Sequence, residues 1–293
     1  MDKQEWLARQ FEECRPHLRA VAYRMLGSLS EADDAVQESW LRLSRSDAGE
    51  IENLGGWLTT VVARVSLNTL RSRRTRREEP FGPHLPDPII DRADGTDPEH
   101  EALLADSVGL ALLVVLETLT PAERLAFVLH DMFSVPFDEI APMLDRSPEA
   151  VRQLASRARR RVSGAAPPVD TDIDGQRRVV DAFLAASRGG DFDALVAVLD
   201  PNVVLRADAG AMHSLSREIR GAETVASQAL MFSRLDLHMR PALVNGVAGL
   251  VATKDGKPFS VMACTVRGDK IAEMDILADP ERLRQLDLTF LGD

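Results

Sequence analysis

The sequence predicts a multidomain chain of 293 residues, in which two all-α helical domains precede an α+β domain. Three observations predict it. Apolar residues recur every three or four positions through residues 1–77, as on one side of an amphipathic helix. Residues 137–162 have the pattern of two helices joined by a tight turn. Near the C-terminus, paired turn residues separate β-rich stretches, which is typical of hairpins.

The first helical domain, about residues 1–77, is expected to contain three helices. One apolar stripe runs from Leu7 to Met25 and stops at a glycine. Ser30 is the expected N-cap of a second helix, which extends to about residue 44. Gly55 and its neighbour Gly56 open a third, longer helix with an apolar side.

Residues 78–101 are predicted to form a linker, because five prolines in this short stretch exclude a regular helix. It is not expected to be slack. Phe81, Leu85, Ile89 and Ile90 are large apolar residues, which another protein surface should cover.

The second helical domain, about residues 102–163, contains the expected helix-turn-helix. Thr120 and Pro121 have the order of an N-cap followed by proline at the first helical position. A short helix over residues 137–144 is followed by a turn, and Ser147 is expected to cap the last helix, which runs to about residue 162.

The third domain, about residues 174–293, begins with helical periodicity that is interrupted at Gly189 and Gly190. Asp255-Gly256 and Gly268-Asp269 are hairpin-type turns. Apolar and acidic residues alternate over 272–276, which predicts a strand with one buried face. Helices first and hairpin-linked strands later indicate an α+β fold with a curved antiparallel sheet.

The charge is distributed unevenly along the chain. The net charge is −11, yet residues 53–77 hold six arginines and no acid, and residues 146–161 hold six arginines and one acid. The linker between them holds eight acids and one arginine. Phosphate binding requires local positive potential, so two basic tracts indicate two contacts with a polyanion.

Cellular location is suggested by two further features. The two cysteines, Cys14 and Cys264, do not form a disulfide framework, which fits a reducing environment. The sequence contains no apolar run of transmembrane length, and its start lacks the apolar stretch of a signal peptide. We therefore expect a cytoplasmic protein without membrane contact.

Three segments of the helical domains resemble one protein family. Residues 31–41 resemble the polymerase-binding helix of extracytoplasmic-function sigma factors, and residues 56–74 resemble their promoter-opening helix. Residues 119–124 and 137–161 are similar to their second DNA-binding domain. The resemblance covers about 160 residues in the family's order, so the first and second helical domains correspond to sigma regions 2 and 4.

This resemblance implies two partners, the RNA polymerase core enzyme and promoter DNA, and assigns residues to each. An acidic face should meet a basic clamp of the polymerase. A polar stripe at helical spacing on residues 64–75 should meet the unpaired minus-ten element, and the outward face of the last helix should lie in the major groove at the minus-thirty-five element. The expected polymerase-binding residues are Asp33, Asp34, Gln37 and Glu38; the minus-ten residues are Arg64, Asn68, Arg71, Arg73 and Arg74; the minus-thirty-five residues are Arg152, Gln153, Ser156, Arg157 and Arg160.

The third domain resembles the SnoaL-like cone fold, which a subgroup of these sigma factors carries at the C-terminus. That subgroup has a linker motif, matched here by residues 84–88 with His84 in place of tryptophan, and two motifs in the third domain, matched by residues 208–211 and 279–283. The resemblance implies that the third domain contacts the linker and regulates the factor in cis. The expected regulatory contact comprises Leu85, Pro86, Asp87, Pro88, Asp208, Asp279, Pro280 and Leu283.

Catalysis by the third domain is not expected. SnoaL-like enzymes use an acid–base pair inside the cone, and Arg206, Asp208, His213 and Asp275 could supply one, but we expect these to be surface residues near strand ends. The histidines lack metal-ligand spacing and the chain lacks a glycine-rich phosphate loop, so neither a metal nor a cofactor is expected.

The sequence therefore predicts a sigma factor that is regulated by its third domain. Two alternatives stay open: a helix-turn-helix regulator with a ligand-sensing domain, and a SnoaL-type enzyme with a DNA-binding extension. The first alternative gives no role to the helical segments over 33–40 and 57–77. The sequence does not name the promoter, the inducing signal, a ligand of the third domain or a separate anti-sigma partner.

Overall fold

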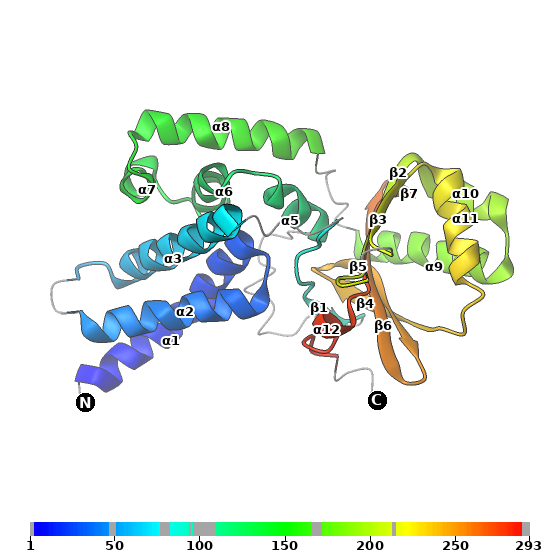
Figure 1. Ribbon diagram of the computed structural model, residues 1–293, viewed down its shortest axis with the longest axis horizontal. Coiled ribbons are helices and arrows are strands. Elements are labelled where there is room, and N and C mark those ends of the chain that lie inside the picture. Colours follow the sequence, from blue (N-terminus) through cyan, green and yellow to red (C-terminus); the bar gives the residue numbers. More distant parts are fainter. Residues whose placement is uncertain are drawn as a thin grey trace. The chain divides into compact units, whose positions relative to one another are not determined.

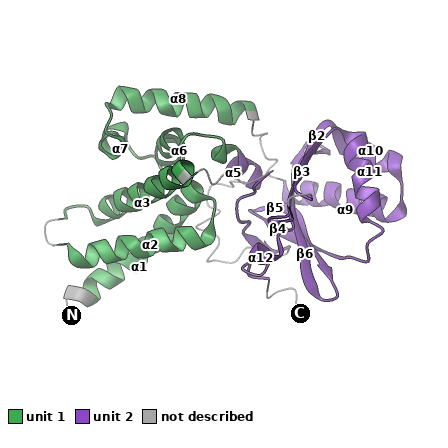
Figure 2. Cartoon of the chain, viewed as in Figure 1, with its two compact units in different colours: residues 1–79, 98–106, 115–165 green, residues 80–97, 107–114, 166–293 purple. Residues whose placement is uncertain are grey.

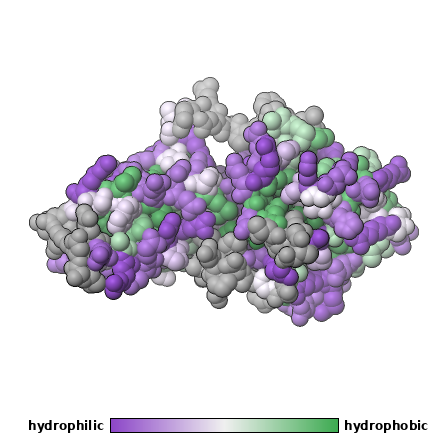
Figure 3. Space-filling model, turned by 90° about the horizontal axis from the view of Figure 1, so that it is seen from below, coloured by the Kyte–Doolittle hydropathy of each residue, from purple (hydrophilic) through white to green (hydrophobic). Residues whose placement is uncertain are grey.

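The computed structural model describes residues 3–46, 51–76, 83–93, 95, 109–165, 172–212 and 215–288. The chain forms two compact units, coloured separately in Figure 2. Unit 1 holds residues 1–79, 98–106 and 115–165, and unit 2 holds residues 80–97, 107–114 and 166–293. On the face shown in Figure 3, hydrophilic residues take up much of the described surface and apolar residues appear between them.

Three packed helices form the first helical domain, as predicted (Figure 1): α1 (Lys3–Leu26), α2 (Leu29–Arg45) and α3 (Leu54–Arg76). Their apolar stripes meet in one core, which includes Leu18, Val21, Met25, Leu43, Leu58 and Val62. The predicted cap of α2 was wrong by two residues. Ser28, and not Ser30, has the extended backbone of a cap, and its side chain accepts a hydrogen bond from the backbone amide of Glu31. Ser30 lies inside the first turn.

The second helical domain contains the predicted helix-turn-helix. Helix α5 (Leu110–Glu117) precedes α6 (Pro121–Phe127), which continues into a π-helical turn over Val128–Met132. Helices α7 (Phe137–Leu144) and α8 (Pro148–Ala165) follow. Between them Asp145 adopts a left-handed backbone conformation, which makes the tight turn. Ser147 accepts the amide of Ala150, so the predicted cap of α8 is confirmed.

The third domain is an α+β fold, as predicted. Helices α9 (Ile173–Gly189), α10 (Phe192–Val198) and α11 (Ala222–Phe232) pack on one face of a seven-stranded sheet. Apolar residues of these helices and of the central strands form one core. The strands β2 (Leu199–Asp208), β3 (Arg217–Arg220), β4 (His238–Val244), β5 (Val247–Lys254), β6 (Lys257–Arg267) and β7 (Lys270–Leu277) belong to this sheet, and the short helix α12 (Pro280–Leu283) follows β7.

Two details of this sheet differ from the sequence-based expectation. It is not wholly antiparallel, because β2 pairs with β7 in parallel. Strand β7 is also buried on both faces. Glu273 and Asp275 were expected to face solvent, yet they are only 8% and 1% exposed. The parallel register sets Arg206 of β2 opposite Asp275 of β7. The acidic face of β7 is therefore covered by the Arg206 side chain rather than by water.

The seventh strand comes from the linker. Strand β1 (Ile90–Arg92) pairs antiparallel with β4, and Ile90 lies opposite Val244. Just before the strand, the Ile89 amide donates to Asn245 Oδ1 at 3.1 Å and the Asn245 amide donates to the Ile89 carbonyl at 2.7 Å. Leu85, Ile89 and Ile90 are all buried. Ile89 and Ile90 therefore pair with the edge of the third domain's sheet, while Phe81, the other large apolar residue of the linker, lies outside the described residues.

Candidate functional site

Helix α8 carries the basic face of the helix-turn-helix. Arg152, Gln153 and Arg160 are exposed, and Ser156 is half-buried. The Arg152 guanidinium lies 5.3 Å from the centre of the Phe137 ring, which holds the side chain at the start of the helix by a cation–π contact. The N-terminal part of α8 therefore presents an arginine and an amide, the groups that read base edges in a major groove.

Three other arginines of α8, namely Arg157, Arg159 and Arg161, form ion pairs with acids. Buried Glu123 accepts from Arg157 Nε at 3.2 Å and from Arg161 Nη1 at 3.0 Å. It also accepts from Thr120 in a capping box at the start of α6. Burial alone would raise the pKa of Glu123, but these donors outweigh it and lower the pKa. Arg159 pairs with Asp131 at 2.5 Å.

Helix α3 presents most of the predicted minus-ten residues. Arg64, Asn68, Arg71 and Arg74 are exposed along it. Arg73 points elsewhere, because it pairs with Glu31 and donates to the Leu26 carbonyl at 3.2 Å. The structure thus leaves four of the five residues on the polar stripe and uses Arg73 to join α3 to the start of α2.

The two helical domains pack together within unit 1. The Arg124 guanidinium is buried and donates through Nε to the Arg24 carbonyl at 3.0 Å. Its burial lowers its pKa to about 10. Arg24, also buried, stacks over the Phe133 ring at 4.8 Å. Two buried guanidinium groups therefore lie where α1 meets the second helical domain, a feature that the sequence did not predict.

The acidic face of α2 is open to solvent. Asp33, Asp34 and Gln37 are exposed, and Glu38 is half-buried. Asp33 accepts from Arg19 Nε at 2.7 Å, and Glu38 accepts from Arg42 at 2.9 Å. Asp34 has no ion-pair partner among the residues that the structure describes. The surface retains negative charge that a basic partner could neutralise.

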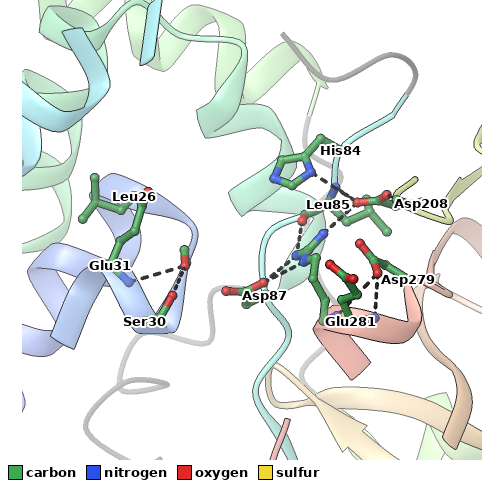
Figure 4. Close-up of polar contacts among 12 residues, drawn as sticks. Leu26, Ser30, Glu31, His84, Leu85, Asp87, Asp208, Asp279 and Glu281 are labelled. Carbon is green, nitrogen blue, oxygen red and sulfur yellow. Dashed lines mark hydrogen bonds and ion pairs between the residues drawn. The ribbon is translucent and has the colours of Figure 1, made fainter. Parts of the chain in front are cut away.

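Besides the strand pairing, the linker contacts the third domain through the side chain of Arg282. Its guanidinium donates to Asp87 Oδ1 at 2.6 Å, to the Leu85 carbonyl at 2.6 Å and to Asp208 Oδ2 at 2.7 Å. The Leu85 amide donates to the same Asp208 oxygen at 2.9 Å. Figure 4 shows His84 and Leu85 of the linker close to Asp208, with Asp87 in the same cluster.

This cluster keeps Asp208 ionised. Burial alone would raise its pKa, but hydrogen bonds from His84, Leu85 and Gly210, with the charge of Arg282, lower the pKa to about 2. Gly210 has a positive φ of 56°, and a Cβ atom there would collide with the Asp279 carboxylate. Gly210 is therefore required even though its neighbours are alanine. Asp279 in turn caps α12, where Leu283 is buried.

The residues considered for catalysis lie in two places. Arg206 Nη1 contacts Glu273 at 2.8 Å and Asp275 at 3.1 Å. Asp208 belongs to the linker contact, and His213 lies outside the described residues. The expectation that these are surface residues was wrong for Asp208 and Asp275, which are 3% and 1% exposed. Burial raises the pKa of Asp275 to about 6, despite the opposing charge of Arg206.

Comparisons with known proteins identify the family. Residues 10–76 match the model for Sigma-70 region 2, and residues 109–162 match the model for Sigma-70, region 4. The ECF RNA polymerase sigma factor SigJ of Mycobacterium tuberculosis H37Rv is 38% identical over 291 residues, covering 93% of this chain and 92% of SigJ. The probable ECF sigma factor SigI of the same strain is 34% identical over 276 residues, with 93% of each chain covered.

The chain belongs to the ECF family of RNA polymerase sigma factors. A crystal structure of M. tuberculosis SigJ superposes with a TM-score of 0.76 at 36% identity and covers 96% of this chain and 99% of that one. The likeness therefore includes the third domain as well as the two sigma regions. None of the helices in the described part of this sigma factor is long and apolar enough to cross a membrane.

Several residues at these sites were not predicted from the sequence, among them Arg282 and Asn245. Glu123 could have been found, since Thr120 and Glu123 have the spacing of a capping box. Arg282 and Asn245 had no local signal, because their partners lie 195 and 156 residues away.

Proposed function

We propose that this sigma factor binds the RNA polymerase core enzyme through α2 and directs it to a two-part promoter in the cytoplasm. Asp33, Asp34, Gln37 and Glu38 would meet a basic surface of the polymerase. The open acidic face of α2 supports this assignment, because complementary charge favours and orients such an encounter.

Promoter recognition would be divided between α3 and α8. Arg64, Asn68, Arg71 and Arg74 would bind the unpaired minus-ten strand, and Arg73 would position α3 from behind. Arg152 and Gln153 would read bases of the minus-thirty-five element. Arg157 and Arg160 would hold phosphates beside Ser156. The exposure of these groups along two helices supports the assignment.

The third domain would regulate the sigma factor in cis without catalysing a reaction. The contacts of Arg282 carry this proposal: one side chain joins Leu85 and Asp87 of the linker to Asp208 of the sheet. The linker connects the two promoter-binding regions, so its conformation bears on the distance between them. Arg206 pairs with both Glu273 and Asp275, which supports a structural rather than a catalytic role.

In vitro transcription with purified core polymerase tests the proposed function. With sheared genomic DNA as template, we expect specific initiation sites that core enzyme alone does not use. Arg282→Ala should change transcript yield, whereas Arg284→Ala, an exposed neighbour that donates to the Pro280 carbonyl, should not. Absence of specific transcripts would reject the sigma function. Equal yields from Arg282→Ala and the unchanged chain would reject regulation through the linker.

A further inference from the structure

A cleft in unit 1 is lined by both helical domains. It has a volume of about 710 Å³. Arg71, Arg74 and Thr75 of α3 line one part, and Arg146, Arg157 and Glu123 of the second helical domain line another. Two basic surfaces that are far apart in the sequence thus open into one space.

The charges in this cleft are not balanced. Its one acid, Glu123, is already bound to Arg157 and Arg161. The guanidinium groups of Arg71, Arg74 and Arg146 have no hydrogen-bond or ion-pair partner within the described part of the chain. Some other exposed arginines pair with acids, as in Arg15–Glu12 and Arg220–Glu218. In a chain with net charge −11, this cleft concentrates unneutralised positive charge.

The packed arrangement of the two helical domains does not fit simultaneous binding of both promoter elements. Elements near positions −35 and −10 are about 25 base pairs apart, or roughly 85 Å at about 3.4 Å per base pair. A cleft of about 710 Å³ that is lined by both Arg71 and Arg157 cannot hold both elements at once. This step rests on the proposed promoter contacts, but the arginines and the cleft do not.

We infer that the cleft binds a compact oligophosphate, in which two or three phosphate groups are linked, as in tripolyphosphate or the phosphate chain of a nucleotide. One guanidinium group can bind two phosphate oxygens through two parallel hydrogen bonds, and three guanidinium groups without a partner among the described residues line the cleft. The volume lies within the range of small-molecule sites, about 300–1,000 Å³. Because the arginines come from two domains, a bound oligophosphate would bridge α3 and the helix-turn-helix.

Such a bridge has a consequence for promoter binding. A ligand that binds only the packed arrangement of the two domains stabilises that arrangement in proportion to its concentration. It would therefore oppose any state in which the domains contact separate promoter elements. The oligophosphate site is a property of this chain alone, so it can be tested without polymerase or promoter.

Calorimetric titration of the full-length protein with sodium tripolyphosphate, at constant ionic strength, is the test. We expect saturable binding that an equal concentration of sulfate does not reproduce. Arg71→Ala and Arg146→Ala should each weaken binding about tenfold or more, the effect of losing a charge-assisted hydrogen bond. Arg9→Ala, an exposed arginine on α1 outside the cleft, should change binding less than twofold.

The double variant Arg71→Ala/Arg146→Ala decides whether the site is shared. If one ligand bridges both domains, the effect of the double variant should differ from the sum of the two single effects. Circular dichroism should confirm that each variant is folded. Absence of binding, or sensitivity to substitutions in only one domain, would overturn the inference.

Two further titrations identify the source of the phosphate groups. A nucleoside triphosphate that binds as tightly as tripolyphosphate would show that the phosphate chain alone is recognised. Tighter binding of the nucleotide would show that the cleft also contacts the base or sugar. Binding of single-stranded DNA without binding of either small anion would contradict the inference, because the cleft would then be only part of the promoter surface.

Discussion

Arg282 Nη1 donates to Asp208 Oδ2 across 2.7 Å and joins α12 to the end of β2. The same guanidinium reaches Asp87 and the carbonyl of Leu85 in the linker. Both carboxylates are largely buried, with side-chain exposures of 5% for Asp208 and 18% for Asp87. A single cation therefore satisfies two buried anions that belong to different segments of the chain.

Removal of this cation should release the linker from the third domain. Arg282→Ala leaves Asp208 buried without its charged partner, which should lower the free energy of unfolding of unit 2 by about 2–4 kcal/mol. Hydrogen exchange should become faster at the amides of Leu85 and Ile89, which donate to Asp208 and Asn245. Arg284→Ala should leave both quantities unchanged. Unaltered exchange in Arg282→Ala would show that the other linker contacts suffice.

Arg152 and Arg157 should contribute differently to promoter binding. Arg152→Ala should weaken the free energy of promoter binding by roughly 1–3 kcal/mol and relax the sequence preference at one base pair. Arg157→Ala should weaken binding evenly across sequences and reduce its dependence on salt. Titrations of promoter variants over a range of salt concentrations measure both effects. Identical affinity and salt dependence for a variant and the unchanged protein would remove that arginine from the DNA interface.

Charge reversal on α2 should abolish polymerase binding. Asp34→Lys introduces a cation on the exposed face without breaking a described ion pair. Asp33→Lys also breaks the exposed pair with Arg19, which costs at most about 1 kcal/mol. The double variant should stay folded and fail to assemble with core enzyme, as measured by gel filtration. Glu12→Lys on α1 is the control. Normal assembly of the double variant would disprove the assignment.

The acid cluster of the third domain should make its stability depend on pH. Burial raises the pKa of Asp275 to about 6 from an ordinary value of 3.8, so the folded state holds a proton that the unfolded chain has lost between these values. The resulting stabilisation is fully present below about pH 4 and is lost as the pH rises through about 6. Relative to that of Asp275→Asn, the free energy of unfolding of the unchanged protein should fall by roughly 1–2 kcal/mol between pH 5 and 7.5.

Urea unfolding at both pH values measures this difference. Asp181→Asn, an exposed substitution on α9, is the matched control and should follow the unchanged protein. The free energies of unfolding of Asp275→Asn and the unchanged protein are compared at the two pH values. If their difference is the same at pH 5 and pH 7.5, Asp275 titrates alike in the folded and unfolded states.

The sequence could predict features whose signals are local. The helix-turn-helix, the caps at Thr120 and Ser147 and the turns at Asp255-Gly256 and Gly268-Asp269 each depend on residues a few positions apart. The periodicity of apolar residues likewise indicated the helices of the first two domains. These predictions were confirmed because neighbouring residues alone decide such structures.

Long-range pairing could not be predicted in this way. The parallel register of β2 and β7 brings Arg206 to Asp275, 69 residues away, and buries an acid that alternation had placed in solvent. The contact of Arg73 with Glu31 joins two helices, so no single-helix pattern could assign it. The apolar residues of the linker did indicate a covering surface, but they could not indicate that the cover would be a sheet edge.

The linker segment that forms β1 is synthesised long before the part of the third domain with which it pairs. Ile89 leaves the ribosome 156 residues before Asn245, the residue that binds it. At about 5–20 residues per second, the segment waits roughly 8–30 s for its place in the sheet. The whole second helical domain is made during that interval. A nascent chain therefore carries two complete promoter-binding domains before the third domain can take up the segment between them.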